Sequence, residues 1–374
     1  MPIRESIVPA LLEAMHGVYL LEGEPMNSPR ISRRSLLQAG AVAPLKAAGD
    51  RAIDIHAHLF PQGYLDIVAA DGARFNTTYK ISGGQLSIQS PLSSNSAPLS
   101  IVDLKARIAE MDRQGVAMQA LSLTGPMVYG GDTDFNRRLA KAWNDGASAA
   151  HLAYPSRLVA FMTLPMLDRD SALDELNRAS KLPGMRGVGM GTNILNHDLD
   201  DPLFEPIFAR IESLGLPIVL HPLSTLASPR LAPFYLGNLL GNPYDTGIAA
   251  CHLILGGVLD RHPRLHFSLP HSGGTLPILI GRIDHGWKVR PETKHLPQAP
   301  STYLGRFSYD TICHSAKILK FLIAELGAER IMLGSDYCYD MGYEQPVEFI
   351  QQAGLTSAQR NMILGGNAAK LLKL

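Results

Sequence analysis

The sequence predicts an α/β fold, a (β/α)8 TIM barrel, because eight short apolar segments alternate with segments of helical period from residue 50 onward. Strands that alternate with helices form parallel sheets, and eight of them favour a closed barrel over an open, doubly wound sheet. The expected strands are residues 52–60, 118–124, 158–165, 186–193, 217–223, 264–271, 306–314 and 330–337.

Three segments between these strands have clear helical signals. Residues 102–115 repeat apolar side chains at helical spacing and end in glycine, and residues 171–180 show the same period. Residues 201–215 begin with Asp-Pro and end with glycine, which is typical of helix termini. Residues 61–100, rich in Gly, Ser and Thr, are expected to form a small insertion after the first strand, over the barrel mouth. Residues 287–303 are expected to form a long loop with prolines.

Residues 1–49 are expected to be a leader and residues 50–374 the barrel domain. The stretch 28–45 contains the twin arginine Arg33-Arg34 followed by a short Ala-rich apolar run, a pattern that resembles a twin-arginine export signal. Two alternatives stay open: an export signal, which would place the protein in the periplasm, or a disordered leader on a cytoplasmic enzyme.

The composition indicates a globular protein that does not bind nucleic acid or membranes. The 374 residues are 46% hydrophobic and 18% charged, with a formal net charge of zero, so no basic surface for an anionic partner is expected. No apolar run is long enough to cross a bilayer as a helix. Cys251, Cys313 and Cys338 lie far apart, so neither a disulfide framework nor a zinc knuckle is indicated.

His56 and His58 stand at the end of the first expected strand, in the stretch "AIDIHAHLFP". Residues i and i+2 of a strand share a face, so both imidazoles can point to one spot. Converging imidazoles suit a divalent transition metal. The alternative is that they are ordinary polar residues at a strand end.

Other strand ends carry further candidate ligands. The active site of a TIM barrel lies at the carboxyl ends of its strands. The fifth, sixth and eighth expected strands end in His221, His271 and Asp336. Agreement among four strand ends favours a metal site.

These motifs resemble the metal-dependent amidohydrolase superfamily, and within it the aminocarboxymuconate-semialdehyde decarboxylase branch. They are D-x-H-x-H, H-P, H-x-G-G and G-S-D-Y, on the first, fifth, sixth and eighth expected strands. The resemblance runs from about residue 52 to 350 and extends beyond the motifs to residues 107–122, 154–166, 256–265 and 281–291.

The resemblance implies that His56, His58, His221 and Asp336 bind one Zn²⁺, with Mn²⁺ as the alternative. The fourth expected strand, "MRGVGMGTN", ends without the lysine that bridges two metals in other superfamily members, so a single ion is expected. His271 is expected to exchange a proton with the metal-bound water. The alternatives for His271 are a fifth ligand or an anchor for the glycine turn that follows it.

By the same resemblance, Arg282 reaches into the site of a neighbouring subunit and holds a substrate carboxylate, so a homodimer is expected. The alternative is a surface ion pair of Arg282 with Asp284 or another acid. Asp310 and His314 are expected to supply supporting hydrogen bonds.

The resemblance therefore implies a non-oxidative decarboxylase of a small unsaturated or aromatic carboxylic acid. The alternative is a hydrolase of a lactone or amide that uses the same metal-bound hydroxide; a binding protein with an unused metal site is a third reading. The residues expected on the substrate side of the site differ from those of the branch at three places. Residues 85–95 contain no arginine, His221-Pro222 is followed by Leu-Ser, and Cys338-Tyr339 stands in place of a proline-aromatic pair.

Overall fold

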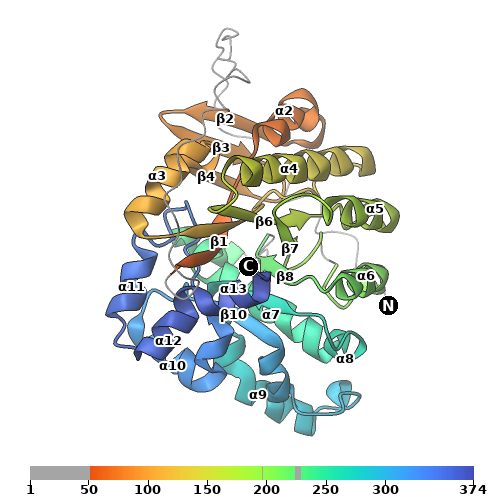
Figure 1. Ribbon diagram of the computed structural model, residues 1–374. Coiled ribbons are helices and arrows are strands. Elements are labelled where there is room, and N and C mark those ends of the chain that lie inside the picture. Colours follow the sequence, from red (N-terminus) through yellow and green to blue (C-terminus); the bar gives the residue numbers. More distant parts are fainter. Residues whose placement is uncertain (1–50, 196, 224–228) are drawn as a thin grey trace, which may run out of the picture. The chain divides into compact units, whose positions relative to one another are not determined.

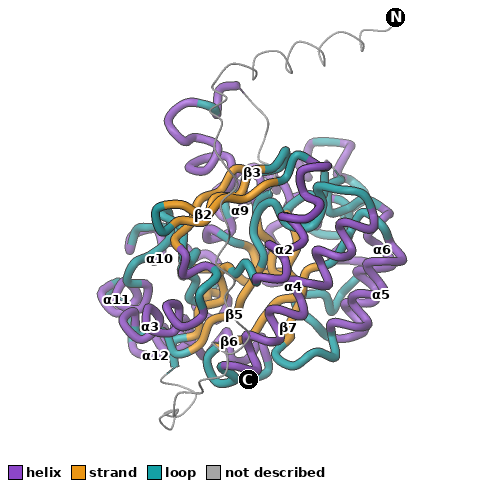
Figure 2. Tube along the Cα trace, turned by 90° about the horizontal axis from the view of Figure 1, so that it is seen from above, coloured by secondary structure: helices purple, strands orange, loops and turns teal. Residues whose placement is uncertain are grey.

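The computed structural model describes residues 51–195, 197–223 and 229–374. Eight parallel strands form one sheet in the order β1-β5-β6-β7-β8-β9-β10-β11, with helices around it (Figures 1 and 2). The strands are β1 (Ile53–His58), β5 (Met118–Ser122), β6 (Leu158–Thr163), β7 (Met185–Gly191), β8 (Ile218–His221), β9 (Phe267–Leu269), β10 (Phe307–Asp310) and β11 (Ile331–Met332). Each falls within or next to its expected segment, and the predicted barrel is confirmed.

The barrel closes between β1 and the short last strand β11. No regular ladder joins the two strands, but the Ile55 amide donates to the Leu333 carbonyl at 2.9 Å and the His58 amide to the Tyr337 carbonyl at 2.7 Å. An isolated bridge between Ala57 and Tyr337 continues this contact. We call this contact between β1 and the segment 331–337 the seam.

The longer helices of the described residues form the outer layer. They are α2 (Gln62–Asp71), α3 (Leu104–Gln114), α4 (Thr133–Ala153), α5 (Arg169–Ala179), α6 (Glu205–Leu214), α7 (Asn242–Leu255), α9 (Leu276–Val289), α10 (Ala316–Leu326) and α11 (Pro346–Gln352). Shorter helices are α8 (Val258–Arg261), α12 (Ser357–Asn361) and α13 (Asn367–Leu372). No helix in the described ranges is both long and apolar enough to span a bilayer.

The expected helices over residues 102–115, 171–180 and 201–215 form as α3, α5 and α6. The expectation of a loop over residues 287–303 is wrong at its start, because α9 continues to Val289. Short 3-10 turns at Pro291–Thr293 and Pro300–Arg306 follow. The expected leader, residues 1–49, lies outside the described residues.

The expected insertion is present after β1. It contains α2 and a three-stranded antiparallel sheet of β2 (Thr78–Ser82), β3 (Gln85–Gln89) and β4 (Ser94–Pro98). Leu86, Ile88 and Ala97 of this sheet are buried. The Asn95 side chain donates to the Gly125 carbonyl at 2.8 Å, so the insertion contacts the chain just after β5, at the carboxyl end of the barrel.

The opposite end of the barrel is filled with apolar side chains. A compact cluster joins residues of five strands to the last helix α13: Ile53, Ile55, Met118, Ala120, Val159, Phe161, Val219 and Met332, with Ala368 and Leu372. Since this end is packed, polar chemistry is confined to the carboxyl ends of the strands.

Trp143 on α4 ties the outer layer to the end of β1, because its buried indole donates to the Leu59 carbonyl at 2.8 Å. We predict that Trp143→Ala lowers the free energy of unfolding by about 3–5 kcal/mol, since a large buried ring is lost. Urea unfolding measures the change. The matched control is Leu152→Ala on the same helix, where the side chain is 65% exposed and the cost stays within about 0.5 kcal/mol. Equal effects of the two changes would contradict the prediction.

Candidate metal centre

A β-bulge in β1 turns both histidines of the "HAH" stretch into the barrel. Against β5, Asp54 pairs with Gln119 but Ala57 pairs with Leu121, so β1 contains one extra residue between these pairs. Alternation therefore resumes in the opposite phase after the bulge. Asp54 lies on the outer face of the barrel sheet, where it contacts Gln119, whereas His56 and His58 point into the barrel interior.

His56, His58, His221 and Asp336 lie together, and one ligand atom from each falls within 4.8 Å of all the others. His58 Nε2 is 3.0 Å and His56 Nε2 is 3.4 Å from Asp336 Oδ1. His56 Nε2 is buried and has no hydrogen-bond partner among the described residues. A buried nitrogen without a partner, beside two more imidazoles and a carboxylate, fits a bound metal ion.

The neighbours of the three histidines set which ring nitrogen is available. Nδ1 of His56 lies 2.8 Å from Asp310 Oδ2, and Nδ1 of His221 lies 2.8 Å from the Pro222 carbonyl oxygen. These acceptors assign the proton to Nδ1. Nδ1 of His58 lies 3.1 Å from the hydroxyl of Ser122, which can accept the same proton. All three rings then present an Nε2 lone pair to the common centre, as metal-binding histidines require.

Asp310 connects His56 of β1 to the turn that carries His271. Its carboxylate also accepts the backbone amides of His271 at 3.0 Å and Ser272 at 2.7 Å. Both of these residues have a left-handed backbone, with φ of 50° and 59°. Such strain in non-glycine residues is costly, and the two bonds to Asp310 offset it. His271 Nε2 is thereby held 3.8 Å from Asp336 Oδ2.

When no metal ion is bound, the electrostatics of the cluster favour a proton on His56. Burial lowers the pKa of His56, but Asp336, Asp310 and Asp54 outweigh it and raise the pKa to about 9. Burial lowers the pKa of His58 to about 4. Burial raises the pKa of Asp336, but His56 and His271 outweigh it and hold the pKa well below its usual value. At neutral pH these shifts favour a protonated His56 beside an ionised Asp336 when no ion is bound.

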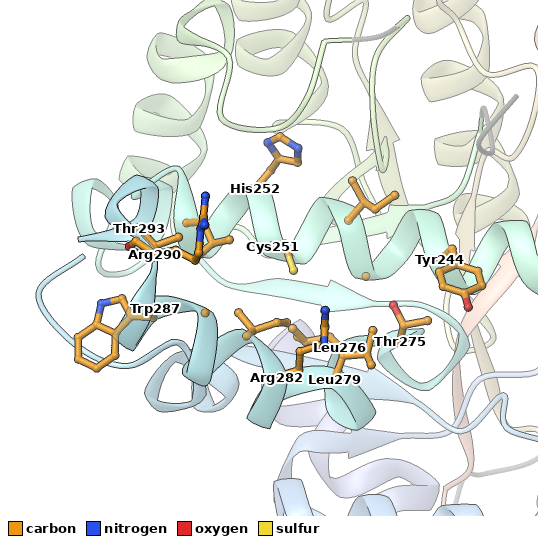
Figure 3. A pocket seen from close by; sticks show the side chains of 15 residues that line it. Tyr244, Cys251, His252, Thr275, Leu276, Leu279, Arg282, Trp287, Arg290 and Thr293 are labelled. Carbon is orange, nitrogen blue, oxygen red and sulfur yellow. Dashed lines mark hydrogen bonds between the residues drawn. The ribbon is translucent and has the colours of Figure 1, made fainter. Parts of the chain in front are cut away.

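Arg282 is not part of this cluster. It is exposed on α9 and points into a groove of about 420 Å³ between α7 and α9 (Figure 3). Its alternative partner Asp284 instead accepts the Ser301 amide, and Arg282 forms no ion pair with any described residue. Trp287 lines the same groove.

Some residues that support the cluster carried no role in the sequence interpretation. Ser122 holds His58 and stands at the end of an expected strand, but a serine there is too common to be a signal. Asp54 belongs to the D-x-H-x-H motif, and its carboxylate accepts the Ser335 amide at 3.0 Å. His314, expected to support the site, lies against Tyr343 with ring centroids 4.7 Å apart.

The fold and the clustered imidazoles define a metal-binding α/β-barrel protein. The chain belongs to the amidohydrolase family: the family model described as Amidohydrolase (Amidohydro_2) matches residues 53–374. The expected superfamily is thus confirmed.

Relatives of this chain include decarboxylases. A 2-amino-3-carboxymuconate-6-semialdehyde decarboxylase from Dictyostelium discoideum is 31% identical over 338 residues, covering 86% of this chain and 91% of the relative. A gamma-resorcylate decarboxylase from Rhizobium sp. is 28% identical and covers 72% of this chain and 86% of the relative. Among solved structures, 5-carboxyvanillate decarboxylase LigW from Sphingomonas paucimobilis matches with a TM-score of 0.75 and 27% identity, over 87% of this chain and 99% of that chain.

We predict that the metal-free protein binds Zn²⁺ more tightly as the pH rises. His56 has a pKa of about 9 and must lose its proton before Nε2 can bind an ion. The apparent affinity should therefore rise about tenfold per pH unit between roughly pH 6 and 8. Competition with a chelator, corrected for the chelator's own protonation, measures this. An affinity that does not change over this range would show that His56 is already neutral.

Proposed function

We propose that this protein is a metal-dependent, non-oxidative decarboxylase of a small unsaturated or aromatic carboxylic acid. The observation that carries the proposal is the convergence of three Nε2 atoms and the Asp336 carboxylate beside an uncommitted imidazole, His271. The relatives that this chain matches over most of their length are named as decarboxylases, which supports this reaction. The hydrolase alternative is not favoured by these relatives. We assign the activity to residues 50–374 and treat residues 1–49 as a leader.

His56, His58, His221 and Asp336 would hold one metal ion. When bound, the ion supplies a Lewis acid that fixes and polarises an anionic oxygen of the substrate. Three imidazoles and one carboxylate suit Zn²⁺, and Mn²⁺, which carboxylate and water ligands also suit, is the alternative. Metal analysis of the purified protein decides between the two.

His271 would supply the proton that the reaction consumes. Non-oxidative decarboxylation breaks the bond between the substrate carbon and its carboxylate, releases carbon dioxide and leaves a hydrogen on that carbon. The electron pair of the broken bond stays on the carbon and takes up the proton. Nδ1 of His271 is buried without a hydrogen-bond partner in the described residues, so the ring is free to serve a substrate.

The first test measures metal content and carbon dioxide release on the same samples. We expect about one ion per chain and release of carbon dioxide from small unsaturated or aromatic acids. Asp336→Asn should lose the ion, because the carboxylate ligand is gone. His271→Asn should keep the ion and lose about 10²–10⁴-fold in kcat. Asparagine suits both positions, since each has a left-handed backbone. A metal-loaded protein that releases no carbon dioxide from any such acid would contradict the proposal.

We also propose that the groove between α7 and α9 forms the interface of a homodimer, in which Arg282 holds the substrate carboxylate of the other subunit. Large apolar side chains are exposed around it: Tyr244 at 45%, Ile278 at 63%, Leu279 at 39% and Val289 at 57%. An exposed apolar surface of this kind is typical of a protein interface. Arg282 lines this groove and forms no ion pair with the described residues, so its guanidinium is available for a carboxylate.

Mixed dimers test this assignment. We expect Arg282→Ala to lower kcat/KM roughly 10- to 100-fold, as expected for a lost hydrogen bond to a charged group. Co-expression of Arg282→Ala chains with His271→Asn chains should then restore activity, because one site of each mixed dimer has both side chains. The control is Arg169→Ala, an exposed arginine on α5 paired with Asp170, which should not change activity. No restoration in proven mixed dimers would place Arg282 in the site of its own subunit or outside any site.

A further inference from the structure

A charged side chain that the proposed reaction does not use lies fully buried behind the metal ligands. Arg107 on α3 is 0% exposed, and its guanidinium donates to the His58 carbonyl oxygen. It also donates to Gln119 Oε1 at 2.8 Å and lies over the Tyr337 ring, 4.6 Å from its centre. His58 is a proposed ligand on one side of the seam, and Tyr337 follows the proposed ligand Asp336 on the other. One side chain therefore contacts both sides.

The charge of Arg107 is balanced by the carboxylate of Asp54, and the side-chain amide of Gln119 connects the two. A buried cation is costly unless it is paired and hydrogen-bonded. Gln119 accepts from Arg107 through Oε1 and donates through Nε2 to Asp54 Oδ2 at 3.1 Å. Asp54 is also 0% exposed. The two opposite charges orient the Gln119 amide, and the three side chains form a connected buried network from α3 through β5 to β1.

The carboxylate end of this network also crosses the seam. Asp54 Oδ1 accepts the backbone amides of His56 and Ser335, each at 3.0 Å, and Oδ2 accepts the Ser335 hydroxyl at 2.5 Å. Ser335 precedes Asp336 in the chain. Asp54 thus joins the chain at His56 to the residue before the carboxylate ligand, while Arg107 joins His58 to the residue after it.

We propose that Arg107 is a positioning residue that fixes the β1 histidines relative to Asp336 and so sets the affinity of the centre for its ion. The inference rests on the metal site of the proposed function. The other strands of the barrel are held by regular ladders, whereas β11 contains only Ile331–Met332 and ends before Asp336. Between β1 and the segment around Asp336, single backbone bonds replace a ladder, so side chains share in setting this distance. Ligands held in place bind an ion more tightly, because less ordering is left for the binding step.

A matched control separates this role from general stability. Arg157 bonds to the chain just before β5: Nε donates to the Ala117 carbonyl at 2.8 Å and Nη2 pairs with Asp112 at 2.7 Å. It has the same chemistry and touches none of the proposed ligands. Arg157→Lys should lower stability without changing the affinity for metal.

The experiment measures the dissociation constant for Zn²⁺ alone, by chelator competition, in metal-free wild type, Arg107→Lys and Arg157→Lys. Lysine keeps the charge but cannot bond to His58 and Gln119 and cover Tyr337 together. We expect binding about 10- to 100-fold weaker in Arg107→Lys and unchanged in Arg157→Lys. Unfolding of the metal-free proteins is followed alongside. Lower stability of Arg107→Lys with wild-type affinity would overturn the proposal.

Should Arg107→Lys not fold, Tyr337→Leu is measured in its place. This change removes the ring beneath the guanidinium and keeps both buried charges. Weaker Zn²⁺ binding supports the positioning role, and wild-type affinity overturns it. A wild-type chain that binds no Zn²⁺ overturns the inference together with the metal site. A wild-type chain that binds Zn²⁺ but releases no carbon dioxide overturns the proposed reaction and leaves the inference standing.

Discussion

The barrel closes between β1 and β11, and three of the four proposed ligands lie beside this seam. His56 and His58 belong to β1, and Asp336 follows β11 after only three residues. Asp336 can lie beside both imidazoles only if β1 and the segment after β11 pair in one particular register. The Asp336 amide provides part of this register by donating to the His56 carbonyl at 2.9 Å. The contacts that close the barrel therefore also place the ligands of the centre.

Close approach of the backbones at the seam restricts which residues fit there. A side chain on Gly334 would place its Cβ 2.8 Å from the Cβ of Asp310 and 3.1 Å from that of His56. These are contacts between atoms next to the backbone, so neither neighbour can move away easily. The glycine lets β1, β10 and the end of β11 approach until Asp310 can hold the His56 ring at 2.8 Å. Residues 334–336 (GSD) thus supply both the glycine that allows this close approach and the proposed ligand Asp336.

The strands and the metal cluster could be predicted because both follow from short-range rules. Apolar runs of four to eight residues mark buried strands, and polar residues at their ends meet at one barrel mouth. The bulge in β1 could not be predicted, since the same ten residues fit a regular strand equally well. The network of Arg107, Gln119 and Asp54 was missed for a similar reason: its bonds join residues 12 and 65 positions apart. Arg107 reads as one more charge on an amphipathic helix until the fold buries it.

The charge of the centre explains why an ion and an anionic substrate belong together. In the metal-free protein, the imidazolium of His56 faces two buried carboxylates, Asp310 and Asp336, whose pKa values are held low mainly by their histidine neighbours against the effect of burial. One positive and two negative charges leave the pocket negative, which repels a carboxylic acid anion in a region of low dielectric. A divalent ion in place of the His56 proton would make the pocket neutral. Such an ion would remove the repulsion as well as offer a ligand position to oxygen. A guanidinium such as the one proposed for Arg282 of a second subunit would then turn a neutral pocket into an attractive one.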